Sequence, residues 1–308
     1  MIRRYFTSSS IRHSLNLEEK QYLNLISTIT QQGDLQKGRN GVVYSRIGEV
    51  MRFSLKHNTI PLLTTKKVAW KICLKELLWF IKGNTNNKLL KKSNVNIWNG
   101  NGTRDFLDSR KLEYLKEDDL GPVYGHQWRF WNAPYNKKLG CLEDYEGKGV
   151  DQLQNVINAL NHPTEKFSRR IIMSAWNPEQ IDEMALPPCH ILSQFKISND
   201  NELSCILYQR SGDVGLGIPF NIASYSFLTH LLAKHCNLQA KEFIHFIGDA
   251  HIYDDHLPVL QEQIKREPFE FPQLIIENTY DDINKYTLDD FTIENYKYSE
   301  KLKMDMRV

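Results

Sequence analysis

The chain has 308 residues, of which 41% are hydrophobic and 25% charged, so it can fold as one large globular domain or two small ones. Its formal net charge of +2 gives no electrostatic reason to expect nucleic-acid or membrane binding. The most apolar segment, residues 70–83, is interrupted by Lys75 and Glu76 and is shorter than the roughly 18 residues that a membrane span needs.

The spacing of the cysteines argues against a zinc site and against a disulfide framework. No two of them form a C-x-x-C pair, and the sequence has no H-E-x-x-H motif. We therefore expect no metal and a reducing compartment, most simply the cytoplasm. The cysteines are Cys73, Cys141, Cys189, Cys205 and Cys236.

The N-terminal segment MIRRYFTSSSIRH carries three arginines, and no acidic residue precedes Glu18. Organelle transit peptides have this composition, and so do ordinary disordered termini. Because the segment is short, we favour a flexible extension over residues 1–16, which leaves a mitochondrial or nuclear location open.

The first half of the chain predicts three helices and one strand. A capping-box pattern from Asn16 to Glu19 predicts a helix that continues to about Gln32. Residues 42–55 alternate as a strand does. Apolar residues at helical spacing predict a second helix over 67–82, stopped by Gly83, and a third over 151–161.

The second half contains most of the predicted sheet. Residues 170–176 indicate a buried strand, and residues 190–198 and 203–210 alternate around a short polar turn as a hairpin does. Residues 221–236 are apolar on most sides, which indicates a buried helix, and residues 242–253 indicate a strand followed by a turn. Strands and helices mix without regular βαβ alternation, so we predict one α+β domain with a largely antiparallel or mixed sheet.

Cys189 and His190 are adjacent in the segment MALPPCHILSQF and could be a nucleophile with its base. Adjacent residues of a strand point to opposite faces, however, so the two side chains are not expected to form such a pair. An activating group for Cys189 must therefore come from another part of the chain.

The predicted hairpin offers Arg210 as that activating group. If the chain turns at residues 200–201, Arg210 lies opposite Ile191 and is a diagonal neighbour of Cys189. A guanidinium there would lower the pKa of the thiol. A register shift of one residue would remove this contact, and an inert buried cysteine is an equally good reading of the spacing alone.

The segment LYQRSGDVGLGIPFN, residues 207–221, is predicted to leave a strand and to start a helix at Asn221. Arg210 and Ser211 at a strand end are suited to hold a phosphate, and the glycines let a flat ligand approach the backbone. A glycine-rich turn with Asn221 as a simple helix cap explains the same residues equally well.

Several segments together resemble thymidylate synthase, and they occur in that family's order over residues 17–308. We therefore take 17–308 as the catalytic domain. The matching segments are PLLTTKKVAWK, ELLWFIKGNTN, GPVYGHQWR, RRIIMSAWNP, ALPPCH, LYQRSGDVGLGIPFNIASY, FIGDAHIY, REPFEFP and KMDMRV.

The resemblance implies a homodimeric α/β enzyme with one domain, whose large sheet packs against that of its mate. It implies methylation of deoxyuridine monophosphate (dUMP) to thymidine monophosphate (dTMP). The cosubstrate would be 5,10-methylenetetrahydrofolate, which gives both carbon and hydride and leaves as dihydrofolate.

The resemblance also implies roles for five catalytic residues. Cys189 matches the nucleophile that adds to C6 of uracil, and His190 is then a supporting neighbour. Glu76 matches the carboxylate that manages protons through water, and Tyr124 matches the residue that helps to remove the C5 proton. The matched catalytic set is Cys189, Glu76, Tyr124, Arg210 and Asn221.

The same comparison implies two sets of ligand-binding residues. Arg169 and Arg170 match a pair that reaches the phosphate from the other subunit, and Asn221 matches the amide that reads uracil. The matched dUMP ligands are Arg39, Arg169, Arg170, Gln209, Arg210, Ser211, Asp213, Asn221, His251 and Tyr253. The matched folate ligands are Trp98, Asp213, Phe220 and Val308.

Four features depart from the family pattern: Asn40, Asn99, Arg307 and a longer segment over residues 130–150. None of them removes a catalytic group. Two alternatives stay open, namely a pyrimidine nucleotide hydroxymethylase of the same fold and a nucleotide- or RNA-binding regulator. The cytosine hydroxymethylase carries Asp at the position of Asn221, so this residue favours uracil.

Overall fold

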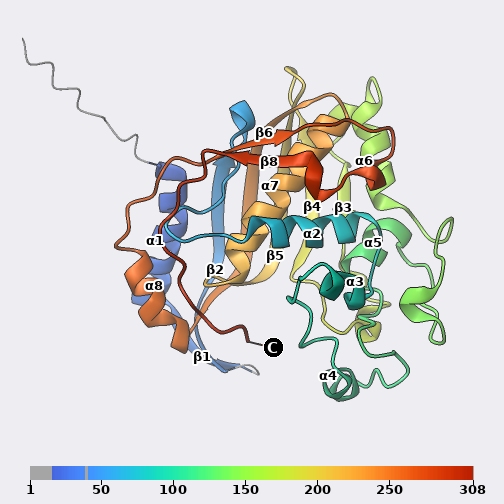
Figure 1. Ribbon diagram of the computed structural model, residues 1–308, viewed down its shortest axis with the longest axis horizontal. Coiled ribbons are helices and arrows are strands. Elements are labelled where there is room, and N and C mark those ends of the chain that lie inside the picture. The colour runs from blue at the N-terminus through green and yellow to red at the C-terminus, as the bar shows by residue number, and fades with distance from the viewer. Residues whose placement is uncertain (1–15, 39–40, 308) are drawn as a thin grey trace, which may run out of the picture.

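A six-stranded mixed sheet forms the centre of the molecule in the computed structural model, which describes residues 16–38 and 41–307 (Figure 1). Strands β5 and β6 run parallel, and the other neighbouring strands are antiparallel, which confirms the predicted mixed sheet. In spatial order the strands are β1 (Asp34–Gly38), β2 (Gly41–Ser54), β6 (Gln239–Tyr253), β5 (Glu202–Asp213), β4 (His190–Ile197) and β3 (Ile172–Ser174).

The central helix α7 packs on β5 and β6, and α2 packs on α7 and on α5 (Figure 1). Most side chains of α7 are buried because the sheet covers one side of the helix and α2 another. The helices are α1 (Leu17–Gln32), α2 (Trp70–Ile81), α3 (Asn87–Lys92), α4 (Arg104–Ser109), α5 (Tyr124–Phe130), α6 (Gln152–Asn161), α7 (Gly217–His235) and α8 (Leu257–Gln263), and a second sheet pairs β7 (Gln273–Ile276) with β8 (Phe291–Glu294).

The ends of α1 and α2 follow from the sequence. The Asn16 side chain accepts a hydrogen bond from the Glu19 N–H (3.0 Å) and caps α1. The Glu19 carboxylate binds Thr64 and Thr65 instead of completing the predicted capping box. Gly83 ends α2 with a φ of +70°, and a Cβ atom there would lie 2.6 Å from the Phe130 ring.

Several predicted boundaries were wrong. Strand β3 has three residues, because it lies at the sheet edge, where Ile172 is exposed. Strand β6 continues to Tyr253 without the predicted turn, since β2 pairs with it up to Tyr253 and β5 up to His251. Helix α7 begins at Gly217, so Asn221 lies inside the helix and is not its cap. Strand β5 extends to Asp213 and carries Arg210 and Ser211 within it.

A line of irregularities crosses the sheet near its functional end. The β2–β6 pairing skips Gly48, which has a φ of +78°, and the β5–β6 pairing skips Arg210. A β-bulge at Ile191 shifts the register between β4 and β5. A β-bulge bends its strand and re-aims side chains, and the one at Ile191 lies two residues after Cys189.

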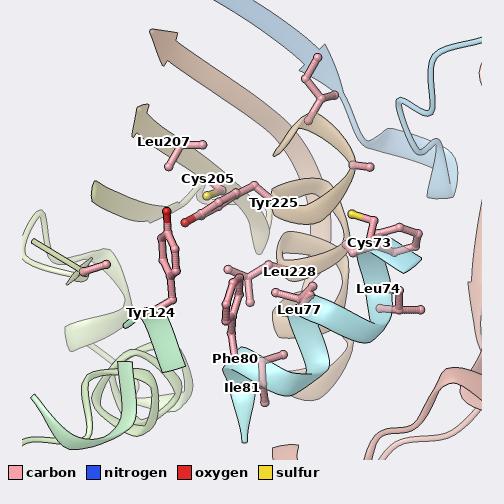
Figure 2. Close-up of a cluster of buried hydrophobic side chains, with 14 of the residues drawn as sticks. Cys73, Leu74, Leu77, Phe80, Ile81, Tyr124, Cys205, Leu207, Tyr225 and Leu228 are labelled. Carbon is pink, nitrogen blue, oxygen red and sulfur yellow. The ribbon is translucent and has the colours of Figure 1, made fainter. Parts of the chain in front are cut away.

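The core between α2 and α7 explains how one carboxyl group comes to be buried. Cys73, Leu77 and Phe80 project from α2 toward α7, where Leu228 and Tyr225 meet them (Figure 2). Glu76 occupies the same helical face, because positions 73, 76, 77 and 80 share one side of an α-helix. The carboxyl group is therefore carried into an apolar region by the packing of its neighbours.

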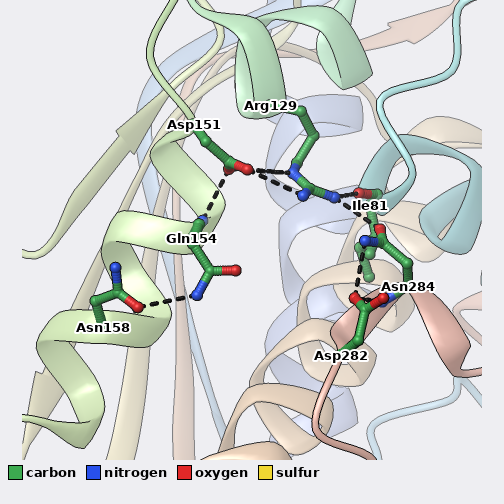
Figure 3. Close-up of polar contacts among 7 residues, drawn as sticks. All are labelled: Ile81, Arg129, Asp151, Gln154, Asn158, Asp282 and Asn284. Atoms are coloured by element: carbon green, nitrogen blue, oxygen red, sulfur yellow. Dashed lines mark hydrogen bonds and ion pairs between the residues drawn. The ribbon is translucent and has the colours of Figure 1, made fainter. Parts of the chain in front are cut away.

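Arg129 joins the elements that position the site (Figure 3). Its Nε atom donates to both carboxylate oxygens of Asp151 (3.1 and 3.0 Å), and Nη1 donates to Ile81 O (2.6 Å) and Asn284 Oδ1 (2.7 Å). Asp151 also caps α6 by accepting from the Gln154 N–H (2.9 Å). One guanidinium thus fixes α5 against the end of α2 and the start of α6.

Candidate active site

Cys189 directly precedes β4 and is held through its backbone on both sides. Its N–H donates to Tyr124 Oη (2.8 Å), and its carbonyl oxygen accepts from the Arg210 N–H (2.8 Å). The Arg210 side chain bends back over the same segment, where Nε donates to Pro188 O (2.8 Å) and Nη2 to Pro187 O (3.1 Å). These contacts place a fixed positive charge beside the thiol.

The predicted hairpin register was wrong, although the predicted neighbour is present. The hairpin closes one residue tighter than expected, with Ile197 opposite Leu203, and the bulge at Ile191 shifts the register again. Arg210 therefore lies directly beside Cys189 and not diagonally across from it. A bulge leaves little trace in the alternation of a strand, so the sequence pattern could not reveal it.

Arg210 lowers the pKa of Cys189 as predicted, but burial has the larger and opposite effect. Burial raises the pKa of the thiol above its usual value, and the Arg210 charge offsets only part of that effect. Among the described residues, Arg210 is the charged group that favours the thiolate there.

His190 does not act as a base toward Cys189. Its ring stacks on Tyr124 with the centroids 4.2 Å apart, and its Nδ1 lies 3.0 Å from Tyr225 Oη. Burial lowers the pKa of His190 to about 3, so the imidazole is neutral. The two tyrosines that contact it approach each other in the core with their hydroxyl ends close (Figure 2).

Glu76 faces the same region from α2. Its Oε1 accepts a hydrogen bond from Trp98 Nε1 (2.7 Å), and the Trp98 ring meets Tyr124 edge-on with the centroids 6.0 Å apart. Burial raises the Glu76 pKa to about 7, against the opposing effect of the Trp98 hydrogen bond. A carboxyl group of this kind can both give and take a proton near neutral pH.

A pocket of about 220 Å³ opens where β2, β5 and β6 end. Three of the predicted dUMP ligands, Ser211, His251 and Tyr253, meet there because the register pairs Tyr253 with Val43 and Ser211 with Asp249. The lining residues are Gly38, Gly41, Val43, Ser211, Asp249, His251 and Tyr253. Arg39 and Asn40, which lie between Gly38 and Gly41 in the sequence, are outside the described residues.

Gln209 and Asn221 are joined by a hydrogen bond. Gln209 Nε2 donates to Asn221 Oδ1 (3.0 Å) and to Ser211 O (2.9 Å). The Gln209 Oε1 atom lies 2.8 Å from Nε2 of His245, which the sequence analysis did not single out. A histidine at an inward position of an otherwise apolar strand was the signal that could have drawn attention to it.

Three of the predicted folate residues are within the described chain, around α2 and the start of α7. The Trp98 indole donates a hydrogen bond to Glu76. One turn before Glu76 on α2, the Cys73 Sγ donates to the carbonyl oxygen of Phe220 (3.3 Å). Asp213 Oδ1 accepts from the Gly215 N–H (2.8 Å) and shapes the glycine loop before α7. Val308 lies outside the described residues.

Two buried basic residues near Asp213 were not predicted. Lys66 donates to Gly215 O, and burial lowers its pKa to about 8. His256 Nε2 lies 2.8 Å from Asp305 O, while its Nδ1 lies 3.8 Å from Asp213 Oδ1. Lys66 lies in the matching segment PLLTTKKVAWK, which was its only sequence signal, whereas His256 lies outside the matching segments.

Arg169 and Arg170 are not among the residues that line the pocket of their own chain. Both are exposed on the loop before β3; the Arg169 carbonyl accepts from Gln194 Nε2 (2.9 Å), and the Arg170 N–H donates to Ser168 Oγ (3.1 Å). Of the four departures from the family pattern, Arg307 forms an ion pair with Asp255 (2.6 Å) that holds the C-terminal segment against the start of α8.

Within residues 16–38 and 41–307, no helix is long and apolar enough to cross a membrane. The same part of the chain contains no group of three or more histidine, cysteine, aspartate or glutamate side chains arranged to hold a metal ion. All five cysteines are free thiols.

The chain is an α/β protein with one mixed sheet, and it carries a cysteine beside an arginine, a carboxyl group with a pKa of about 7 and a polar pocket where three of its strands end. The chain belongs to the thymidylate synthase family, because the family model described as thymidylate synthase matches residues 20–308.

Curated relatives agree with this assignment. The thymidylate synthase of Saccharomyces cerevisiae is 48% identical over 303 residues, which cover 95% of this chain and 98% of the relative. The bifunctional dihydrofolate reductase-thymidylate synthase of Plasmodium berghei is 50% identical over 300 residues, and the probable thymidylate synthase of Schizosaccharomyces pombe 49% identical over 314. These matches cover 97% and 98% of this chain but 50% and 49% of the relatives, so the chain spans about half the length of several proteins that it matches.

Proposed function

We propose that the protein converts dUMP and 5,10-methylenetetrahydrofolate into dTMP and dihydrofolate. The observation that carries this proposal is the position of Cys189 directly beside Arg210, next to the strand ends that bear Ser211 and His251. Family membership and the names of the relatives, which include a thymidylate synthase of nearly equal length, support the same activity.

Cys189 would act as the nucleophile. C5 of uracil is a weak nucleophile, but addition of a thiolate to C6 turns the ring into an enolate whose C5 can attack an electrophilic carbon. Arg210 would stabilise the thiolate, and the binding of a phosphate would hold its guanidinium at the site. The sulfur leaves again when C6 regains its double bond to C5.

Glu76 and Tyr124 would handle the protons of this reaction. The Glu76 pKa of about 7 lets the carboxyl exchange a proton with uracil O4 through water at neutral pH. Tyr124 Oη is 2.8 Å from the Cys189 N–H, so its oxygen lies at the nucleophile and could accept the C5 proton through an ordered water.

The pocket residues would hold dUMP by its three parts. Ser211 with Arg39 and Arg210 would bind the phosphate, since hydroxyl and guanidinium groups suit its oxygens. His251 and Tyr253, which lie together on β6, would bind the sugar hydroxyl. Asn221 and Gln209 would bind the base from the other side of β5, and Asp213 would contact it from the loop that follows.

The residues around α2 fit a folate. A pterin is flat and carries several N–H donors, and it would meet the aromatic side chains of Trp98 and Phe220 and the carboxylate of Asp213. Bound methylenetetrahydrofolate supplies the one-carbon unit and the hydride. The C-terminal segment would close over both ligands with Val308, and Arg307 and Asp305 already attach that segment to Asp255 and His256.

One face of the sheet would form a homodimer interface. Val50 and Tyr208 both lie opposite Phe246, and the three side chains form an exposed apolar row across three strands. Ile47, nearby on β2, is 80% exposed. Exposed apolar surface of this kind marks an interface. A partner on this face would bring its Arg169 and Arg170 to the phosphate.

We further propose that residues 17–308 form the catalytic domain, with residues 1–16 as an extension, and that the protein works in a reducing compartment such as the cytoplasm, where its five thiols stay free.

The test of this function is a product assay. The protein is mixed with dUMP and methylenetetrahydrofolate, dihydrofolate is followed by its absorbance, and the nucleotide product is identified by chromatography. We expect equal amounts of dTMP and dihydrofolate. A hydroxymethylated nucleotide would show instead that water replaces hydride, and no product at all would contradict the proposal.

A further inference from the structure

His245 lies in β6 with no solvent exposure, and its Nε2 lies 2.8 Å from Gln209 Oε1. Its Nδ1 has no hydrogen-bond partner among the described residues. Burial lowers the pKa of His245 to about 3, so the ring is neutral and carries one proton. Because an amide oxygen only accepts hydrogen bonds, that proton must be on Nε2.

The hydrogen bond from His245 fixes the orientation of the Gln209 amide, and this orientation in turn fixes Asn221. With its Oε1 facing His245, its Nε2 donates to Ser211 O (2.9 Å) and to Asn221 Oδ1 (3.0 Å). The reverse orientation would set the amide oxygen of Gln209 against the carbonyl oxygen of Ser211, which can only accept. The oxygen of Asn221 is therefore held toward Gln209, and its amide nitrogen is directed the other way.

The orientation of the Asn221 amide determines which pyrimidine it can read. Uracil presents an acceptor at O4 and a donor at N3, whereas cytosine presents a donor at N4 and an acceptor at N3. An asparagine amide matches the first pattern in one orientation and the second after rotation by 180°. An amide free to rotate would accept both bases, so discrimination requires that it be locked.

We propose that His245 is a positioning residue for base recognition: its Nε2–H locks Gln209, and Gln209 locks Asn221 in the orientation that selects uracil over cytosine. The inference rests on the function proposed above. Without the His245 donor, Gln209 Oε1 is left buried and unpaired. This unfavourable state promotes rotation of the Gln209 side chain away from Asn221.

The test compares the ratio of kcat/KM for dUMP to that for dCMP in the full-length protein. His245→Phe removes the donor and keeps a ring, and we expect the ratio to fall about tenfold, the effect of one lost buried hydrogen bond. His245→Gln restores a donor at a similar position and should recover most of the ratio. A ratio that is unchanged in folded His245→Phe protein would overturn the proposal.

His230→Phe is the matched control. His230 is another buried histidine, with Nε2 2.9 Å from Thr59 O, and it lines a separate pocket of about 570 Å³ that contains none of the predicted substrate residues. Its replacement should leave the ratio unchanged. A loss of the ratio equal to that of His245→Phe would assign the effect to general loosening of the core and would overturn the proposal.

A second measurement needs no variant. Nitrogen-15 NMR of the imidazole distinguishes the two neutral tautomers, and His245 of the wild-type protein should carry its proton on Nε2 throughout pH 5–8. A proton on Nδ1 would overturn the proposal even if His245→Phe fails to fold. Wild-type protein that binds dUMP in preference to dCMP but forms no dTMP would contradict the proposed function alone, whereas equal kcat/KM for dUMP and dCMP with the tautomer as expected would overturn the proposal made here.

Discussion

Burial opposes the ionised forms of the two side chains that the proposed reaction uses as charges, Cys189 and Glu76. For Glu76 the consequence is measurable as stability. Its pKa rises from 4.5 unfolded to about 7 folded, so the folded protein binds more protons between these values and loses stability as the pH increases through them. The cost is complete above pH 7 and absent below pH 4.5, and amounts to roughly 3 kcal/mol.

Replacing Glu76 by glutamine removes that cost while an amide oxygen still accepts from Trp98. Glu76→Gln should therefore gain stability over wild type as the pH rises from 4.5 to 8, by up to about 3 kcal/mol, and should lose most of its turnover. Urea denaturation at several pH values measures the difference. A difference that stays constant with pH would mean that Glu76 is not buried with a raised pKa.

Asn221→Asp tests base reading at the residue that contacts the base. Aspartate keeps an oxygen for Gln209 Nε2 but replaces the nitrogen that would donate to uracil O4 with a second acceptor. We expect kcat/KM for dUMP to fall, and the ratio of kcat/KM for dUMP to that for dCMP to decrease at least about tenfold. Steady-state kinetics with both nucleotides would contradict the role of Asn221 if the ratio were unchanged.

At the scale of single residues, the sequence could predict candidate site residues where the side chain belongs to a recognisable sequence motif. Cys189, Glu76 and Ser211 could be named in advance, and the opposite faces of a strand argued correctly against a Cys189–His190 pair. His245 could not be named, because its role depends on the amide of Gln209, on another strand. The sequence also could not reveal that burial raises the pKa of the Cys189 thiol by more than Arg210 lowers it.

At the scale of elements, periodicity predicted the existence of α1, β2, α2 and α6 to within a few residues, because one face of each is buried. It could not predict the bulge at Ile191 or the early start of α7, which depend on pairing with distant strands. It also gave no sign that one side chain, Arg129, would join α5 to α2 and α6.

Arg129→Ala should therefore destabilise the fold and loosen the site together. The guanidinium is largely buried, and its loss leaves the Asp151 carboxylate without its ion-pair partner and the Ile81 carbonyl without the donor that Arg129 supplies. We expect a loss of about 2 kcal/mol, less than for a fully buried pair because Asp151 is partly in water. Urea denaturation measures it, with Lys265→Ala as control.

Lys265 pairs with Glu262 on the exposed surface, so its loss should cost less than about 0.5 kcal/mol. Equal effects of the two substitutions would show that the Arg129 contacts do not hold the elements together.

At the scale of the whole molecule, the proposed dimer makes a prediction about mixed subunits. A Cys189→Ser chain keeps intact Arg169 and Arg170, and an Arg170→Thr chain keeps an intact nucleophile. If each site takes arginines from the other chain, two inactive proteins that exchange subunits should regain one working site per mixed dimer. Recovery is measured as dTMP formation, and none after proven exchange would contradict a shared site.

The central claim is that Cys189 forms a covalent bond to C6 of the pyrimidine, and one measurement tests it most directly. The test uses dUMP that carries fluorine in place of the hydrogen at C5. Because the reaction must remove a proton from C5 and this analogue has none to give, the reaction with methylenetetrahydrofolate should stop with nucleotide and folate attached to the enzyme. Mass spectrometry of the denatured, digested protein should find this added mass on the peptide that contains Cys189, and none in the Cys189→Ser variant. Attachment to another cysteine, or no attachment by protein that binds both ligands, would contradict the account.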